Sequence, residues 1–483
     1  MTSPGPIVVV GGGVSGLAVA WRVHQGLARR GITAPVLVLE QSPRTGGVLR
    51  RGRLSGGPAV PSLMIDLGAE SLLARRPEAL DLIAELGLQD DLVHPRTSQA
   101  AIWSRGMLHP MPPGTQMGVP SDVDALRGLL TDEEVGTAAG ERGRPMLPLG
   151  PDDDLDVAAL VAGRLGAAVV DRLVDPLLGG VYAGRADRLS VRATLPALWP
   201  AARDGQSLLD AVAGGLPAAG IAPGPVFAGL RGGVGRLAET LDHRLTDAGV
   251  TIELRACVQQ LRRAPGRRSG WQLVLGPPGQ GRTIDACAVV LAVPAPAVGR
   301  LLSTVEASAS AELAGVEVAS IALVTVLLPP GTLDGAGAGA ELSGVLVPAV
   351  EGRVIKAMTF SSRKWQWVDE AAAGHDVLRM SVGRAGDPGD LRRSDEDLVR
   401  AAVDDAAHLL GCRLPVLASL VTRWGGGLPQ YEPGHVAMVD RVQAAVAGHE
   451  GLAVAGSVWG GVGVPACLAT ADAAAERVLA HLG

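Results

Sequence analysis

The stretch IVVVGGGVSGLAVAWRVHQGLARRG, residues 7–31, decides the fold of this chain. It begins with four β-branched residues, which are typical of a buried parallel strand, and it continues as an apolar helix. Gly11, Gly13 and Gly16 form a G-x-G-x-x-G turn between the two. In such a turn the first glycine permits the bend, the second lets the backbone approach a pyrophosphate, and the third lets the helix pack on the strand. The stretch predicts a strand–turn–helix unit that binds a dinucleotide.

A second predicted strand, residues 34–40, ends in Glu40. An acidic residue at this place accepts hydrogen bonds from adenosine ribose hydroxyls and disfavours a 2′-phosphate. Phosphates are expected at the start of the preceding helix, where backbone N–H groups are free. The alternative is a merely tight strand–helix turn. The predicted dinucleotide contacts in this region are Gly11, Gly12, Gly13, Val14, Ser15, Gly16, Glu40 and Gln41.

Composition narrows the function classes. The 483 residues carry a net charge of −6 with both signs interspersed, which argues against a nucleic-acid surface. Four cysteines without C-x-x-C spacing predict neither a disulfide framework nor a zinc site, and the acidic run 152–154 is interpreted as a solvated helix start. The longest apolar run, 286–298, is too short to cross a bilayer, and the opening residues enter a strand directly. We expect a cytoplasmic protein without a metal or a transmembrane segment.

The segment EQSPRTGGVLR, residues 40–50, resembles the E-x-x-x-R-x-G-G pattern of flavoproteins of the amine oxidase superfamily. The resemblance implies that Arg44 contacts the pyrophosphate of FAD and that Gly46, Gly47 and Val48 pass close to the cofactor. The segment MIDLGAESLL, residues 64–73, resembles the part of this superfamily that passes over the flavin. It adds Gly68, Ala69, Glu70 and Ser71 to the predicted contacts.

The chain ends on a second strand–glycine–helix unit, GLAVAGSVWGGVGVPACLATADAAAERVL, residues 451–479. We expect a strand that ends near Gly456, a turn over 460–465 and a helix that starts near Ala466. The positive end of this helix would favour negative charge on the pyrimidine edge of a reduced flavin. A C-terminal helix that only packs on the sheet is compatible with this reading. Gly456, Val462, Gly463 and Val464 are therefore predicted flavin contacts.

Several further stretches resemble the protoporphyrinogen/coproporphyrinogen oxidase family, in the family's order and over residues 7–479. They are LHPMPPGTQMGVP (108–120), LVDPLLGGVYAGRADRLSVRATLPAL (173–198), SSRKW (361–365), RWGGGLPQYEPGH (423–435) and GVGVPACL (461–468). The first stretch most resembles the bacterial coproporphyrinogen III oxidases. By family position, Trp424 lies against the flavin and Val258 against the adenine, although both could be plain core residues.

The resemblance implies an enzyme with noncovalent FAD that oxidises a porphyrinogen in haem biosynthesis. Hydride passes to flavin N5, and O2 is the electron acceptor and yields H2O2. Product aromaticity drives the reaction, so the protein mainly orients the substrate and excludes water. None of the nine histidines lies in a recognisable acid–base constellation, and no catalytic base is assigned. A downstream chelatase that receives the product is a further expected partner.

The tetrapyrrole substrate carries carboxylates, which arginine and lysine recognise. Arg75 and Arg76 match a basic pair in the bacterial family and are the first candidates, although a solvated helical turn is an equal alternative. Arg363 and Lys364 are weaker candidates. Coproporphyrinogen III is the favoured substrate and protoporphyrinogen IX the alternative.

The sequence alone leaves other functions open. A flavin amine oxidase usually carries a lysine near flavin N5, on the strand that matches residues 318–326, and none is present there. A carotenoid desaturase has no supporting motif. A flavin-containing tetrapyrrole carrier without turnover is not excluded by any residue.

The predicted fold is α/β, with a split Rossmann-like FAD domain of the amine oxidase type, a mixed-sheet substrate domain and a helical subdomain. The FAD domain is assigned to 1–75, 225–300 and 420–483. The substrate domain is assigned to 76–100 and 301–419, and the helical subdomain to 101–224.

Overall fold

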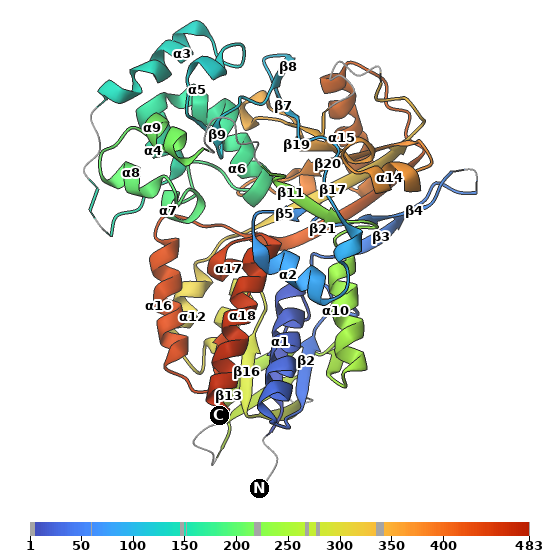
Figure 1. The fold of residues 1–483 in the computed structure, drawn as a ribbon, viewed down its shortest axis with the longest axis vertical. Coiled ribbons are helices and arrows are strands. Elements are labelled where there is room, and N and C mark those ends of the chain that lie inside the picture. The colour runs from blue at the N-terminus through green and yellow to red at the C-terminus, as the bar shows by residue number, and fades with distance from the viewer. Residues whose placement is uncertain are drawn as a thin grey trace.

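The computed structural model describes residues 5–58, 60–144, 149–150, 152–216, 224–265, 270–276, 281–334 and 342–482. A parallel sheet built from distant parts of the chain is the base of the lower lobe (Figure 1). Its order is β12 (Thr251–Leu254), β2 (Val36–Glu40), β1 (Ile7–Val10), β16 (Ala288–Leu291) and β22 (Leu452–Val454). β1 is central and all four of its residues are buried, as a β-branched strand covered on both faces requires.

Helices cover one face of this sheet and a small antiparallel sheet covers the other. On the first face α1 (Val14–Arg30), α10 (Arg236–Asp247) and α18 (Val464–His481) share a core with α2 (Pro77–Glu85), and α1 and α18 lie side by side (Figure 1). The second face packs on β13 (Val258–Arg263), β14 (Trp271–Leu275) and β15 (Arg282–Ala286), and on α11 (Ala295–Leu302), α12 (Ala307–Ala314) and α16 (His435–Ala447). The fold prediction of an α/β chain with a split parallel-sheet lobe is confirmed.

A seven-stranded mixed sheet forms a second lobe. Its order is β21 (Ala418–Pro429), β17 (Val318–Leu328), β20 (Asp376–Val382), β19 (Ile355–Phe360), β18 (Gly344–Leu346), β7 (Ala100–Ser104) and β8 (Met107–Pro110). One face packs on α15 (Asp395–Leu410). The other face packs on β3 (Arg51–Leu54), β4 (Leu63–Asp66) and α14 (Gln366–Ala371), which follows the short α13 (Ser361–Lys364).

A helical lobe with its own apolar core lies beside this sheet (Figure 1). Its helices are α3 (Asp132–Ala139), α4 (Val157–Leu165), α5 (Ala167–Val169), a π-helical turn (Val170–Val174), α6 (Asp175–Tyr182), α7 (Val191–Thr194), α8 (Trp199–Arg203) and α9 (Leu208–Gly215). A three-stranded sheet of β5 (Leu72–Leu73), β11 (Phe227–Leu230) and β6 (Leu92–Val93) lies where the lobes meet (Figure 1).

Two of the expected domain boundaries differ from the strand pairing. β7 and β8 belong to the seven-stranded sheet, although residues 101–110 were assigned to the helical subdomain. β21 pairs with β17 in the same sheet, although residues 420–429 were assigned to the FAD domain. β7 and β21 join partners more than 90 residues away in sequence, and periodicity within a strand carries no information about such partners. The naming of the lobes as cofactor and substrate domains stays a prediction.

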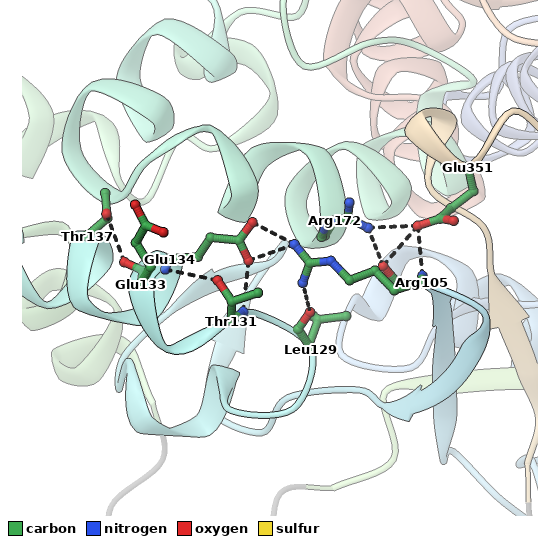
Figure 2. Close-up of polar contacts among 9 residues, drawn as sticks. Arg105, Leu129, Thr131, Glu133, Glu134, Thr137, Arg172 and Glu351 are labelled. Atoms are coloured by element: carbon green, nitrogen blue, oxygen red, sulfur yellow. Dashed lines mark hydrogen bonds and ion pairs between the residues drawn. The ribbon is translucent and has the colours of Figure 1, made fainter.

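The helical lobe is tied to the seven-stranded sheet by a polar network (Figure 2). Arg172 of the π-helical turn donates to Glu351 at 2.7 Å, and the same carboxylate oxygen accepts from Ser104 Oγ and the Arg105 amide, each at 3.0 Å. The Arg105 side chain reaches back and donates to Glu134 at 2.6 and 2.8 Å. One carboxylate therefore connects three segments of the chain.

We expect Glu351→Ala to lower the free energy of unfolding by about 2–3 kcal/mol, because Arg172, Ser104 and the Arg105 amide all lose an acceptor in a mostly buried place. Urea unfolding measures this loss. Glu133→Ala is the matched control, since that side chain is exposed on α3, and it should change stability by less than about 0.5 kcal/mol. Equal effects of the two variants would contradict the assigned role of Glu351.

Within the described residues, no helix has both the length and the apolar character needed to cross a bilayer. The same part of the chain holds no group of three or more histidine, cysteine or acidic side chains placed to bind a metal. All four cysteines are free thiols, and Cys467 is buried.

Candidate flavin and substrate site

The first glycine turn is sterically restricted to glycine. Gly11 has φ of 108°, and a Cβ there would lie 2.3 Å from the Ala292 carbonyl oxygen. A Cβ on Gly16 would lie 1.8 Å from the Gly11 oxygen. α1 starts at Val14, and its N-cap residue Gly13 provides no side-chain cap. The first N–H groups of α1 are therefore available to an anion at the carboxyl edge of the sheet.

Glu40 closes this turn from the end of β2. Its two carboxylate oxygens accept from the Gly12 and Ser42 amides, each at 2.7 Å. Each oxygen retains a second acceptor position, so a ribose hydroxyl can still be bound. Gln41 and Val258 lie beyond Glu40, where Val258 is buried and the Cys257 thiol lies 3.9 Å from Gln41 Oε1.

A second glycine loop lies against the first. The Gly46 amide donates to the Gly12 oxygen at 2.8 Å, and a Cβ on Gly47 would lie 3.2 Å from Gly13 Cα. Arg44 is folded onto this loop and donates to the Thr45 oxygen at 2.9 Å. Burial lowers the pKa of its guanidinium, which nevertheless stays charged. The pyrophosphate contact of Arg44 stays a prediction, since these hydrogen bonds also give it a structural role.

The C-terminal unit brings a second helix start to the same edge. After β22 the chain turns through Gly456 and Gly461, with φ of 128° and 131°, and the short α17 (Ser457–Gly460) lies between them. α18 starts at Val464, two residues earlier than expected, and its N-cap Gly463 provides no side-chain cap. Ser15 in the first turn of α1 is hydrogen-bonded to Cys467 in the first turn of α18, so two uncapped helix N-termini lie close together.

Residues 64–73, predicted to pass over the flavin and called here the flavin-covering segment, are held from three sides. A Cβ on Gly68 would lie 1.9 Å from the Val48 oxygen, which brings the two predicted flavin-contacting segments together. Trp424 Nε1 donates to the Leu67 oxygen at 2.7 Å. Arg379 of β20 donates to the Gly68 oxygen. The neighbouring Ala69 and Ser71, also predicted contacts, are half-buried.

Glu70 is the centre of a buried charge cluster. It accepts from Lys364 Nζ at 2.8 Å, Arg379 at 3.1 Å and Trp365 Nε1 at 3.4 Å. Burial alone would raise the pKa of this carboxyl, but the two cations outweigh burial and lower the pKa to about 2. Glu70 is thus an ionised internal counter-ion. Three protein side chains already donate to its carboxylate, and the direct contact of Glu70 with the cofactor stays a prediction.

Asp66 lies at the other end of the same segment. It accepts from the Val234 and Gly235 amides at 2.8 and 2.9 Å, just before α10. Burial raises its pKa to about 7 against the opposing effect of these hydrogen bonds. Asp66, Glu70 and Arg379 line a cavity of about 20 Å³, which is room for a single water molecule. Trp367 also lines this cavity, and its buried Nε1 has no partner among the described atoms.

The predicted substrate residues fall into two groups. Lys364 is the partner of Glu70, and Arg363 pairs with Asp334 at 3.2 Å, so the structure gives both a structural role that the prediction did not include. Arg75 and Arg76 are exposed just before α2, and Arg76 pairs with Glu78 at 2.5 Å. They follow β5, where Leu73 faces Phe227 of β11 and both side chains are largely exposed.

Sequence reasoning missed Arg379, which joins Glu70 to the Gly68 backbone. A signal was present, because Arg379 is the single charged residue between Asp376 and the end of an otherwise apolar strand, DVLRMSV. A charge at such a place needs a buried partner.

A parallel-sheet lobe with paired glycine turns and two uncapped helix starts is typical of nucleotide-binding proteins. Comparison with known proteins gives the class, a flavin-dependent oxidoreductase. The pattern of the flavin-containing amine oxidoreductase family matches residues 14–479. The coproporphyrinogen III oxidase of Mycobacterium tuberculosis is 39% identical over 482 residues, covering 99% of this chain and 98% of that protein. The human protoporphyrinogen oxidase is 28% identical over 508 residues and covers 98% of each chain.

A crystal structure from Exiguobacterium sp. 255-15, provisionally assigned as a protoporphyrinogen oxidase, has a TM-score of 0.83 at 31% identity and covers 99% of each chain. This chain therefore belongs to the flavin-containing amine oxidoreductases and, among them, to the protoporphyrinogen/coproporphyrinogen oxidase family.

Proposed function

We propose that this protein binds FAD noncovalently and oxidises coproporphyrinogen III to coproporphyrin III in haem biosynthesis. The single observation that carries the proposal is 39% identity to a coproporphyrinogen III oxidase over 99% of this chain. The geometry agrees with it, because the glycine turns at both ends of the chain meet at one sheet edge. A tetrapyrrole carrier without turnover would not need both glycine turns, because it would not need to hold a cofactor in a fixed geometry.

The described residues fit FAD. Gly11–Gly16 and Gly46–Val48 place bare backbone beside the first helix start, where free N–H groups would bind a pyrophosphate. Glu40 retains acceptor positions for the ribose. Gly68–Ser71, Trp424 and the turn Gly456–Val464 would hold the flavin ring. The strand that carries Trp424 contains no cysteine for a covalent attachment.

In the proposed reaction, the residues of this chain position the substrate and exclude water from the site. Arg379 and Trp424 fix the backbone of 67–70 through its carbonyl oxygens, so this segment presents one rigid surface. The start of α18 favours negative charge beside Gly463. The flavin, when bound, supplies the two-electron acceptor at N5, and O2 accepts the electrons and gives H2O2. No side chain is assigned as a base.

We expect the double variant Arg75→Ala/Arg76→Ala to raise KM for coproporphyrinogen III about tenfold with kcat within twofold, because exposed charge-assisted bonds to carboxylates are lost. Steady-state oxidation measures this. Arg400→Ala, an exposed arginine on α15, is the control and should change neither constant. An unchanged KM in the double variant would remove this pair from the substrate site.

Porphyrin fluorescence and peroxide release, measured with coproporphyrinogen III and protoporphyrinogen IX under air, test the proposed function. Formation of coproporphyrin with three molecules of H2O2 for each porphyrin, one for each two-electron step, and a higher kcat/KM for coproporphyrinogen III is the expected result. A preference for protoporphyrinogen IX would favour the second candidate, which the human relative supports. The absence of porphyrin from both would contradict the proposal.

A further inference from the structure

The chain has two lysines, of which Lys356 is buried and Lys364 is half-buried. Lys364 is paired with Glu70. Lys356, on β19, is only 5% exposed, and within the described part of the chain no side chain or backbone group forms a hydrogen bond or ion pair with its Nζ. An ammonium group without a partner is costly to bury, so such a group calls for an anion that the protein itself does not provide.

A β-bulge sets the position of Lys356. The register of β19 against β20 shifts between Ile355 and Ala357, which leaves Lys356 as the extra residue. Bulges of this kind redirect a side chain and are frequent next to active sites. On the other side of β19, the Val347 amide donates to the Lys356 oxygen at 2.9 Å, so the backbone at the bulge is anchored.

The charged neighbour of Lys356 is a cation. Arg384 is the charged group that acts on it most directly, and this arginine is anchored by a 3.0 Å bond to the Val347 oxygen. The carboxylates that act on Arg384 are Asp175 of α6, Asp387 and Asp390. Asp175 already accepts from the Ala186 amide. Burial first and Arg384 second lower the pKa of Lys356 to about 7, so the amine can gain its proton when an anion arrives.

We propose that Lys356 and Arg384 form a carboxylate subsite for the substrate, at the junction of the seven-stranded sheet and the helical lobe. α6 packs on β18 and β19 at this junction. The subsite would bind the propionate groups of the porphyrinogen that lie farthest from the flavin. The proposal rests on the proposed function and extends it to substrate recognition.

β19, which carries Lys356, also pairs with the strand that holds the flavin-covering segment, residues 64–73. Thr359 of β19 lies directly opposite Arg379, the residue that holds the Gly68 backbone. Lys356 is three residues from Thr359, which corresponds to about 10 Å along the strand. A porphyrinogen with one meso carbon at the flavin would present its distal carboxylates at a comparable distance.

The two-lysine composition gives a direct test. The FAD-loaded protein, prepared with lysine labelled at 13Cε, has two lysine resonances, and Lys356→Met and Lys364→Met assign them. Saturation with coproporphyrin III should raise the pKa of Lys356 by at least one unit, and the Lys364 resonance serves as the internal reference. A Lys356 titration that does not move in a protein saturated with coproporphyrin III would overturn the subsite.

Steady-state kinetics give a second test. Lys356→Met should raise KM for coproporphyrinogen III roughly ten- to hundredfold, the loss expected for charge-assisted hydrogen bonds, with kcat changed less than threefold. Its Tm should equal or exceed that of the wild type, because a buried amine without a partner is removed. Lys364→Met should instead lower Tm, because Glu70 loses one of its cations.

The outcomes separate this inference from the proposed function. Turnover of coproporphyrinogen III by the wild type with an unchanged KM in Lys356→Met overturns the subsite alone. A wild type that neither binds coproporphyrin III nor oxidises the porphyrinogen overturns both.

Discussion

Glu70→Gln will lower the free energy of unfolding by about 3–5 kcal/mol at pH 7, because it leaves two buried cations without their counter-charge. Lys364 and Arg379 both bond to the Glu70 carboxylate, and their side chains are 14% and 10% exposed. Glutamine keeps the shape of the side chain and one acceptor oxygen. The loss of stability therefore measures the contribution of the negative charge of Glu70. Chemical denaturation at pH 7 measures it.

The pH dependence of this variant follows from the lowered pKa. The folded carboxyl titrates at about 2 and its ordinary value is 4.5, so its stabilisation is fully present above pH 4.5 and is lost as the pH falls towards 2. The difference between wild type and Glu70→Gln should therefore narrow over this range. Glu78→Gln, which breaks the exposed pair with Arg76, is the control and should cost less than about 1 kcal/mol. A constant difference down to pH 2 would argue against an ionised Glu70.

Gly16→Ala should lower the affinity for FAD about a hundredfold and the free energy of unfolding by about 2–3 kcal/mol. The added methyl would lie 1.8 Å from the Gly11 oxygen, so α1 must move away from the turn that precedes it. That displacement moves the uncapped N–H groups away from the predicted pyrophosphate. Flavin content after purification and a fluorescence titration with FAD measure the effect.

Gly163→Ala is the matched control for this variant. Gly163 lies within α4, and no atom lies within 4 Å of a Cβ placed there. Alanine should leave FAD binding unchanged and stabilise the helix by up to about 1 kcal/mol. If Gly16→Ala retains wild-type FAD affinity, the first glycine turn is not the pyrophosphate site.

Local signals predicted the parallel-sheet lobe. The β-branched run before Gly11, the glycine spacing and the apolar helix each lie within 25 residues, so their periodicity reports β1 and α1 directly. The C-terminal unit was predicted for the same reason. Its helix begins at Val464, before Pro465, because proline is favoured in the first helical turn.

The rest of the site depends on pairs that are far apart in the sequence. Glu70 meets Lys364 and Arg379 across about 300 residues, so no periodicity reports the pairing. The sequence suggested a cofactor contact for Glu70 and a substrate contact for Lys364, which stay predictions, and it did not reveal the ion pair between them. For the same reason the sequence did not predict that β7, β8 and β21 belong to the seven-stranded sheet.

Anaerobic mixing of the FAD-loaded protein with coproporphyrinogen III, followed by flavin absorbance, tests the central claim most directly. The account predicts rapid bleaching of the oxidised flavin, and its recovery with coproporphyrin fluorescence and H2O2 when O2 is admitted. A flavin that stays oxidised with coproporphyrinogen III and with protoporphyrinogen IX, but is bleached by an amine, would contradict the account and favour an amine oxidase.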